Sequence, residues 1–287
     1  MNQRILLTAT VAGLICAHAL AATPPAAPAG PWAKVPAFPT ACYAEQDHWR
    51  DQSSAALEAV HEDLDKQKEV NNAIEQRLQS AMQENPMAMA QALQQAMMSD
   101  PGNAQKIMEK MTQTGEQGQT EIPAQAQKES QFKADARALV KQYYAALEKA
   151  FGPGDARWAA LKKKGGYEPD AIGPGESGVA EWIWAEWDVI LRDWKAGYQA
   201  NCAVWFATTS AMHAFLQRYK NYLINERIPT EKRLIDQPLL DQYQMMDIPT
   251  TGWRTTSDYQ AVIDYIGMAG EMFDQRKDTV ACELNCR

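Results

Sequence analysis

The stretch "EWIWAEWDVILRDW", residues Glu181–Trp194, holds four of the nine tryptophans within fourteen residues and is the strongest indication of helical architecture in the chain. When Trp182 is set at zero and each residue advances by about 100°, most large apolar side chains up to Leu223 fall between roughly 100° and 200°. These side chains belong to Trp184, Trp187, Leu191, Trp194, Tyr198, Cys202, Trp205, Met212, Leu216, Tyr219 and Leu223. The pattern predicts one uninterrupted helix from about Gly178 to Glu226, with this stripe buried against neighbouring helices.

Trp182 is the exception within this stretch. It projects toward the charged side of the predicted helix, together with Glu186 and Asp193. Two interpretations stay open: the indole packs under the loop that precedes the helix, or it is exposed and stacks on a partner or a sugar. Trp182 is therefore a candidate partner-binding residue.

A second long helix is predicted from about Tyr43 to Glu84, where proline is absent. Its apolar residues recur in a seven-residue pattern, and the polar residues Gln67 and Asn71 occupy two positions of that pattern. The apolar positions are Leu57, Val60, Leu64, Ile74 and Leu78.

The rest of the chain also predicts helices. Two short Met-rich helices within residues 86–112 form a hairpin split at Ser99-Asp100-Pro101, and a last amphipathic helix spans about Ser257 to Gln275. The glutamine- and glycine-containing segment Gln113–Ser130 predicts a loose connection, and "GPGD" at 152–155 predicts a helix stop. Since no segment alternates like a strand, we expect an all-α fold, an elongated bundle of long antiparallel amphipathic helices with short Met-rich helices.

The N-terminus predicts export. One basic residue, Arg4, precedes an apolar run and small residues, which is typical of a secretory signal over residues 1–22, cleaved near Ala21 or Ala22. Lipidation at Cys16 is the alternative, and the bulky residue before it argues against it. The apolar run is shorter than the ~20 residues of a membrane span, and no later stretch reaches that length without charges. We expect a periplasmic or secreted protein.

Two regions follow the predicted signal. Thr23–Thr40 carries six prolines and predicts a semi-rigid linker outside the core, followed by a single helical domain over residues 41–287. Removal of Arg4 changes the charge from 28 − 36 = −8 to 27 − 36 = −9. An acidic chain repels phosphate backbones, which disfavours nucleic acid as a partner.

Four cysteines remain after cleavage, and an even number in an exported chain favours two disulfides. A crosslink that closes roughly 80 residues or more stabilises a protein by about 4–5 kcal/mol in the chain-entropy model. We therefore favour pairing of each tail cysteine with one of the two earlier cysteines. A bond within the tail and metal ligation by the thiols are the alternatives. The four are Cys42, Cys202, Cys282 and Cys286.

Methionines are concentrated in one segment of the chain. Their flexible thioethers suit three roles: filling a core of short helices, lining an apolar groove that holds partner segments, or capturing copper(I). Met87 and Met89 point about 200° apart on a helix, which argues against joint chelation. The seven residues are Met82, Met87, Met89, Met97, Met98, Met108 and Met111.

This segment also carries a resemblance. The stretch "NPMAMAQALQQAMMSDPGNAQKIMEKM", Asn85–Met111, resembles the Met- and Gln-rich helices of stress-inducible-type co-chaperone repeats, which Asn-Pro and Asp-Pro also punctuate. The resemblance covers about thirty residues and implies a groove for apolar peptide segments. Those repeats belong to cytosolic proteins, so membership does not follow.

The sequence offers little that predicts catalysis. The G-x-G-x-x-G match at Gly173–Gly178 lacks the preceding strand of a dinucleotide site, and Glu176 would repel phosphates. The pairs Glu45/His48 and Glu58/His61 lie about 20 Å apart on one helix and cannot share a metal, although His61 with its neighbours could hold a surface zinc. His213 lies at the border of the tryptophan stripe, where a hydrogen-bonded histidine is the expected role.

These observations predict function only coarsely. We expect an exported, non-catalytic helical binding or scaffold protein without a cofactor or metal site, with a protein or an apolar peptide or ligand as its partner. The first alternative is a periplasmic copper(I)-handling protein that uses the methionines. The second is a hydrolase whose acidic residues converge only in three dimensions.

Overall fold

The computed structural model describes residues 30–38, 43–99, 101–169 and 178–274, and within these ranges it contains helices and no strand. The all-α prediction is confirmed. The predicted signal at 1–22, Cys42 and both tail cysteines lie outside the described residues. The elements are η1 (Pro31–Lys34), α1 (Tyr43–Glu84), α2 (Ala88–Ser99), α3 (Pro101–Lys163), α4 (Glu181–Tyr222), η2 (Leu223–Arg227), α5 (Ile228–Glu231), η3 (Lys232–Asp236), α6 (Gln237–Met245) and α7 (Ser257–Asp274).

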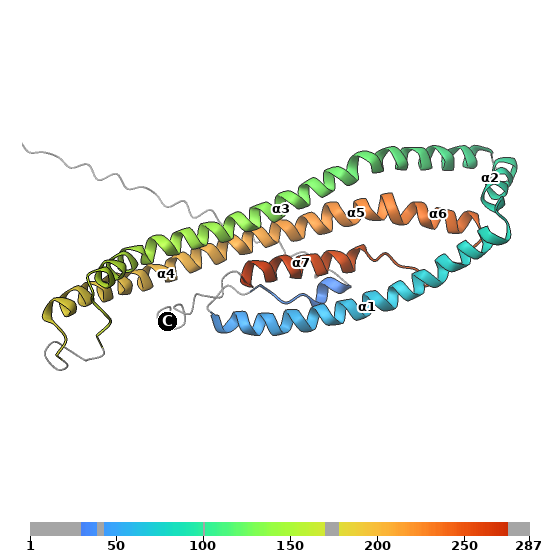
Figure 1. Ribbon diagram of the computed structural model, residues 1–287. Helices are drawn as coiled ribbons and strands as arrows, with labels where there is room; N and C mark the ends of the chain where they lie inside the picture. The colour runs from blue at the N-terminus through green and yellow to red at the C-terminus, as the bar shows by residue number, and fades with distance from the viewer. Residues whose placement is uncertain (1–29, 39–42, 100, 170–177, 275–287) are drawn as a thin grey trace, which may run out of the picture.

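The molecule is elongated. The 63 residues of α3 span about 95 Å at 1.5 Å per residue, and α3 runs antiparallel to a rod that is continuous from α4 to α6. Helix α7 lies between this pair and α1, and it contacts both (Figure 1). Helix α2 connects α1 to α3 at one end of the molecule. The helices α1 and α7 have the bounds that the sequence predicts, to within one residue.

The rod continues beyond the predicted end near Glu226, through Pro229 and Pro238. Proline lacks an N–H, and its ring clashes with the carbonyl four residues earlier, so it normally breaks a helix. Immediately before each proline the helix widens into a π turn: the Ile228 N–H donates to the Leu223 carbonyl, and the Gln237 N–H donates to the Lys232 carbonyl. The wider turns accommodate both rings. The segments near Glu231–Asp236 and Pro238–Met245, which the sequence suggests as separate short helices, are therefore part of one continuous rod.

Helix α3 corrects three predictions. Gln113–Ser130 is helical and not a loose connection, the "GPGD" segment does not stop the helix, and the second Met-rich helix is the first part of α3. An internal proline costs about 3 kcal/mol and a glycine about 1 kcal/mol, which local propensity does not recover. Packing of α3 along the rod offsets this cost, and hydrogen bonds from Gln125 to Glu231 and from Arg233 to Gln117 and Glu121 add to the contact.

The end of the predicted linker belongs to the core, which contradicts the expectation that this segment lies outside it. Trp32 of η1 is 5% exposed and packs edge-on against Tyr265, with 5.7 Å between ring centroids. Phe38 is 7% exposed and lies 5.8 Å from the ring of Trp49. Proline-rich composition predicts an extended backbone, and here it carries two aromatic side chains that the hydrophobic effect buries.

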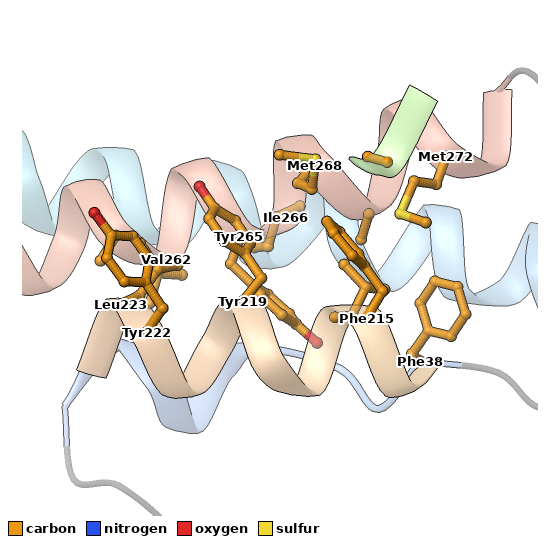
Figure 2. Close-up of a cluster of buried hydrophobic side chains, with 14 of the residues drawn as sticks. Phe38, Phe215, Tyr219, Tyr222, Leu223, Val262, Tyr265, Ile266, Met268 and Met272 are labelled. Atoms are coloured by element: carbon orange, nitrogen blue, oxygen red, sulfur yellow. The ribbon is translucent and has the colours of Figure 1, made fainter. Parts of the chain in front are cut away.

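Aromatic residues of α4 form the centre of the core (Figure 2). Phe215, Tyr219 and Tyr222 follow one another along one face of α4 and point toward α7. From α7, Val262 and Ile266 fill the space between them, at the helical spacing that the sequence predicts. The core is therefore a contact between α4 and α7, which α1, α3 and the N-terminal segment cover.

The tryptophan stripe is confirmed in part. Trp187, Met212, Leu216, Tyr219 and Leu223 are buried, as the helical projection predicts. Leu191 and Tyr198, however, are each 45% exposed, whereas Ile183 and Ile190 are buried. In this region α4 packs against the end of α3 around Leu161, and one neighbouring helix covers a narrower arc than the several helices around the core.

Two glycine variants test the α3–α4 contact. A Cβ on the buried Gly197 would lie 2.8 Å from the Phe151 ring and 2.9 Å from the Ala150 carbonyl oxygen, so the helices would have to separate. We expect Gly197→Ala to lower the free energy of unfolding by about 1–3 kcal/mol in urea denaturation. A Cβ at Gly267 of α7 would meet open space. Gly267→Ala should therefore raise the free energy of unfolding by about 0.5–1 kcal/mol. Equal changes in unfolding free energy for the two variants would contradict the close contact between α3 and α4 at Gly197.

Candidate functional site

A cleft of about 540 Å³ lies where three segments meet, and we call it the junction cleft. One wall is the rod at η3 and α6, the second is the loop before α7 with the first turn of α7, and Gly30 and Pro31 close the end. The volume is within the range of small-molecule sites, about 300–1,000 Å³.

The rod wall follows from helical spacing. Lys232, Asp236 and Leu240 recur every four residues and line the cleft together, so they lie on one face of the rod. The π turn η3 spans the first two of them and leads into Pro238. π turns occur frequently at functional sites, because the extra residue in the turn changes the direction of neighbouring side chains.

The opposite wall is held in place by α1. The Gln67 amide donates to the Gly252 carbonyl at 3.0 Å, and the Asn71 amide donates to the Arg254 carbonyl at 2.8 Å. The Arg254 N–H returns a hydrogen bond to the Asn71 side-chain oxygen at 3.3 Å. Gln67 and Asn71 are the two polar residues that interrupt the apolar repeat of α1. Their structural role is to fix the loop that carries Trp253 and Arg254.

Two aromatic residues contribute to the apolar lining of the cleft beside Leu240 and Pro31. Trp253 and Tyr259 line the cleft and are both half-buried. Trp253 also packs against a small core formed by Ile74, Tyr243 and Ile248. A ring that is held on one side and accessible on the other can bind a ligand without losing much side-chain entropy.

Of the charged groups that line the cleft, Lys232 and Asp258 form an ion pair, and Asp236 forms none within the described part of the chain. Lys232 donates to Asp258 at 2.9 Å, so these two charges neutralise one another. The Oδ2 atom of Asp236 is buried and, among the residues that the structure describes, has no hydrogen-bond partner. Burial raises the pKa of Asp236 above its ordinary value, and a hydrogen bond with Thr255 acts in the opposite direction.

An ion cluster around the buried Arg227 joins α3, the rod and α7. Arg227 is 8% exposed and bonds Glu129 of α3 at 3.2 Å, Glu231 of α5 at 2.8 Å and Asp264 of α7. Because one guanidinium joins three helical elements, it fixes α7 relative to the rod. The carboxylates hold the pKa of Arg227 above its usual range despite burial, so this group stays charged.

The predicted partner-binding residues lie elsewhere in the molecule. Trp182 is 44% exposed in the first turn of α4, in agreement with its projection away from the apolar stripe. Met82, Met87, Met97 and Met98 are exposed, and Met89 is half-buried. The side chains of Met108, Met111 and Cys202 are outside the described part of the chain.

The other sequence candidates do not assemble into a site. The His48 ring lies 2.9 Å from the Gln52 amide, and the His213 ring lies against Phe38 at 6.4 Å. Over residues 30–274, apart from the undescribed gaps, no group of three His, Cys, Asp or Glu side chains is arranged to hold a metal ion. Most of Gly173–Gly178 lies outside the described residues.

Sequence reasoning missed the residues of the junction cleft. Asp236, Trp253, Arg254 and Tyr259 are far apart along the chain and follow no recognised motif. One signal was available, namely the polar interruption of the α1 repeat, because two polar residues in a buried pattern require partners.

Comparison of the chain with protein-family models, with curated proteins and with solved structures finds no match. The described residues form an elongated all-α protein with a cleft of small-molecule size. Among the described helices, none combines the length and the apolar character that crossing a bilayer requires.

Proposed function

We propose that this is an exported, non-catalytic helical binding protein, and that its ligand occupies the junction cleft against Trp253 and Tyr259. The observation that supports the proposal most directly is the cleft itself, about 540 Å³ with two half-exposed aromatic rings and an unpartnered carboxylate oxygen. Export rests on the N-terminal sequence.

Preorganisation of the cleft favours binding. The loop that carries Trp253 is anchored to α1 by hydrogen bonds from Gln67 and Asn71, and α7 is anchored to the rod by Arg227. A cleft whose walls are already fixed does not have to be ordered when the ligand binds, so more of the interaction energy appears as affinity. The copper(I) and hydrolase alternatives stay predictions.

An environment-sensitive dye tests the proposal. We expect anilinonaphthalene sulfonate to bind the protein, and Trp253→Ala to weaken the binding by roughly tenfold or more, since truncation of a buried aromatic anchor costs about 2 kcal/mol. Fluorescence titration measures the affinity, and far-ultraviolet circular dichroism checks that the variant is folded.

Trp182→Ala is the matched control, because it removes an exposed tryptophan that does not line the cleft. The dye affinity of this variant should equal that of the unchanged protein. Equal losses in both variants, or no loss with Trp253→Ala, would contradict ligand binding in the junction cleft.

A further inference from the structure

The junction cleft is lined by one acidic residue, Asp236, and one basic residue, Arg254, that form no ion pair with any residue the structure describes. We infer that its ligand is a small zwitterion, in which an ammonium group meets Asp236, a carboxylate meets Arg254, and an apolar part lies against Trp253 and Tyr259. This is the chemistry of an α-amino acid with a large apolar side chain or of a very short peptide. The inference rests on the proposed function, because it names the ligand class of the same cleft.

The anionic group is Asp236. Asp236 lines the cleft, and its buried Oδ2 atom has no hydrogen-bond partner in the described part of the molecule. A buried acceptor without a partner destabilises a protein, so a ligand that donates a hydrogen bond there recovers this free energy. An ammonium group supplies both the donor and the opposite charge.

The cationic group is Arg254. Only its backbone is engaged, by Asn71 of α1, and its guanidinium makes no ion pair with any residue that the structure places. The backbone bonds fix the position of Arg254, which lines the cleft and is exposed. A guanidinium binds a carboxylate through two parallel hydrogen bonds, which gives orientation as well as affinity.

The charge balance of the cleft selects a zwitterion over a simple ion. Lys232 pairs with Asp258, although its charge also favours the ionised form of Asp236, and this leaves Asp236 and Arg254 as the two cleft residues of opposite sign without an ion pair among the described residues. A ligand with only an ammonium group leaves Arg254 unmatched, and a ligand with only a carboxylate leaves Asp236 unmatched. A sugar offers donors to both groups but no charge for either.

Competition against the bound dye tests the inference. L-phenylalanine should displace anilinonaphthalene sulfonate at a concentration at least about tenfold lower than N-acetyl-phenylalanine, which lacks the ammonium group, or phenylalanine amide, which lacks the carboxylate. Maltose serves as the uncharged comparison and should not displace the dye. Asp236→Asn should abolish the advantage of phenylalanine over the N-acetyl compound, and Arg254→Gln should abolish its advantage over the amide.

Asp135→Asn and Arg218→Gln are matched controls, because both residues line a separate groove between α3 and α4. These variants should still bind phenylalanine more tightly than N-acetyl-phenylalanine and more tightly than phenylalanine amide. Asp236→Asn should also raise the thermal midpoint of the ligand-free protein, since it removes a carboxylate that burial disfavours. A loss of preference caused by misfolding would lower the midpoint instead, so the two outcomes are separable.

Failure of the zwitterion inference can be distinguished from failure of the proposed binding function. If dye binding depends on Trp253 but phenylalanine is no better than its singly charged derivatives, the zwitterion inference is wrong and the proposed binding function stands. If dye binding does not depend on Trp253, the proposed function fails and the inference fails with it.

Discussion

Replacing Arg227 with alanine is expected to lower the free energy of unfolding by about 3–5 kcal/mol, because removing one partner of a buried ion cluster leaves the others uncompensated. Arg227 is 8% exposed, and its loss leaves Glu129, Glu231 and Asp264 close together without a cation. Urea denaturation followed by circular dichroism at neutral pH measures the change. We also expect weaker dye binding, since the cluster holds α7 against the rod.

Arg233→Ala is the control for this prediction. Arg233 lies six residues further along the rod and pairs with Glu121, but its side chain is 46% exposed. Surface pairs contribute about 0–1 kcal/mol, so this variant should be nearly as stable as the unchanged protein. Similar losses for both arginines would show that the cluster around Arg227 is not buried in solution.

Replacing Phe215 with alanine is expected to cost about 3–5 kcal/mol of unfolding free energy, the usual cost of truncating a buried phenylalanine. The Phe215 side chain is fully buried between α4 and α7, where it packs edge-on against Phe132 at 5.9 Å and stacks on Tyr219 at 6.4 Å. The substitution leaves a cavity at the contact shown in Figure 2. Thermal or urea unfolding measures the loss.

Phe206→Ala provides the same chemical change on the same helix at a side chain that is 45% exposed. It should cost about 1 kcal/mol or less, because little apolar surface returns to water. A Phe206→Ala loss as large as that of Phe215→Ala would mean that an undescribed segment or a partner covers the exposed stretch of α4.

Proline placement and apolar periodicity predicted the helices correctly where tertiary packing favours the same helices. The bounds of α1 follow from a stretch without proline and those of α7 from its amphipathic pattern, and Trp187, Met212 and Leu216 are buried as their helical angles require. Prediction failed where several helix-breaking residues occur together, as at Pro123 and Pro153 of α3. A propensity of a few kcal/mol is a weak signal when a neighbouring helix stabilises the same segment along its length.

The candidate site could not be predicted in the same way. Asp236, Trp253 and Tyr259 belong to different elements, and each is unremarkable in its own stretch of sequence. Only the polar residues Gln67 and Asn71 indicated an interaction, because their place in an apolar repeat requires hydrogen-bond partners. Their partners, the carbonyls of Gly252 and Arg254, are more than 180 residues away along the chain.

Apolar periodicity alone was enough to predict that the chain is helical and which faces of α1, α4 and α7 are apolar, and residues 1–22 predict export. Three features became visible only in the folded molecule: the rod continues through Pro229 and Pro238, Trp32 and Phe38 belong to the core, and three distant segments line one cleft. Periodicity is a property of neighbouring residues, whereas helix continuity and the cleft depend on burial and hydrogen bonds between segments that are far apart in the sequence.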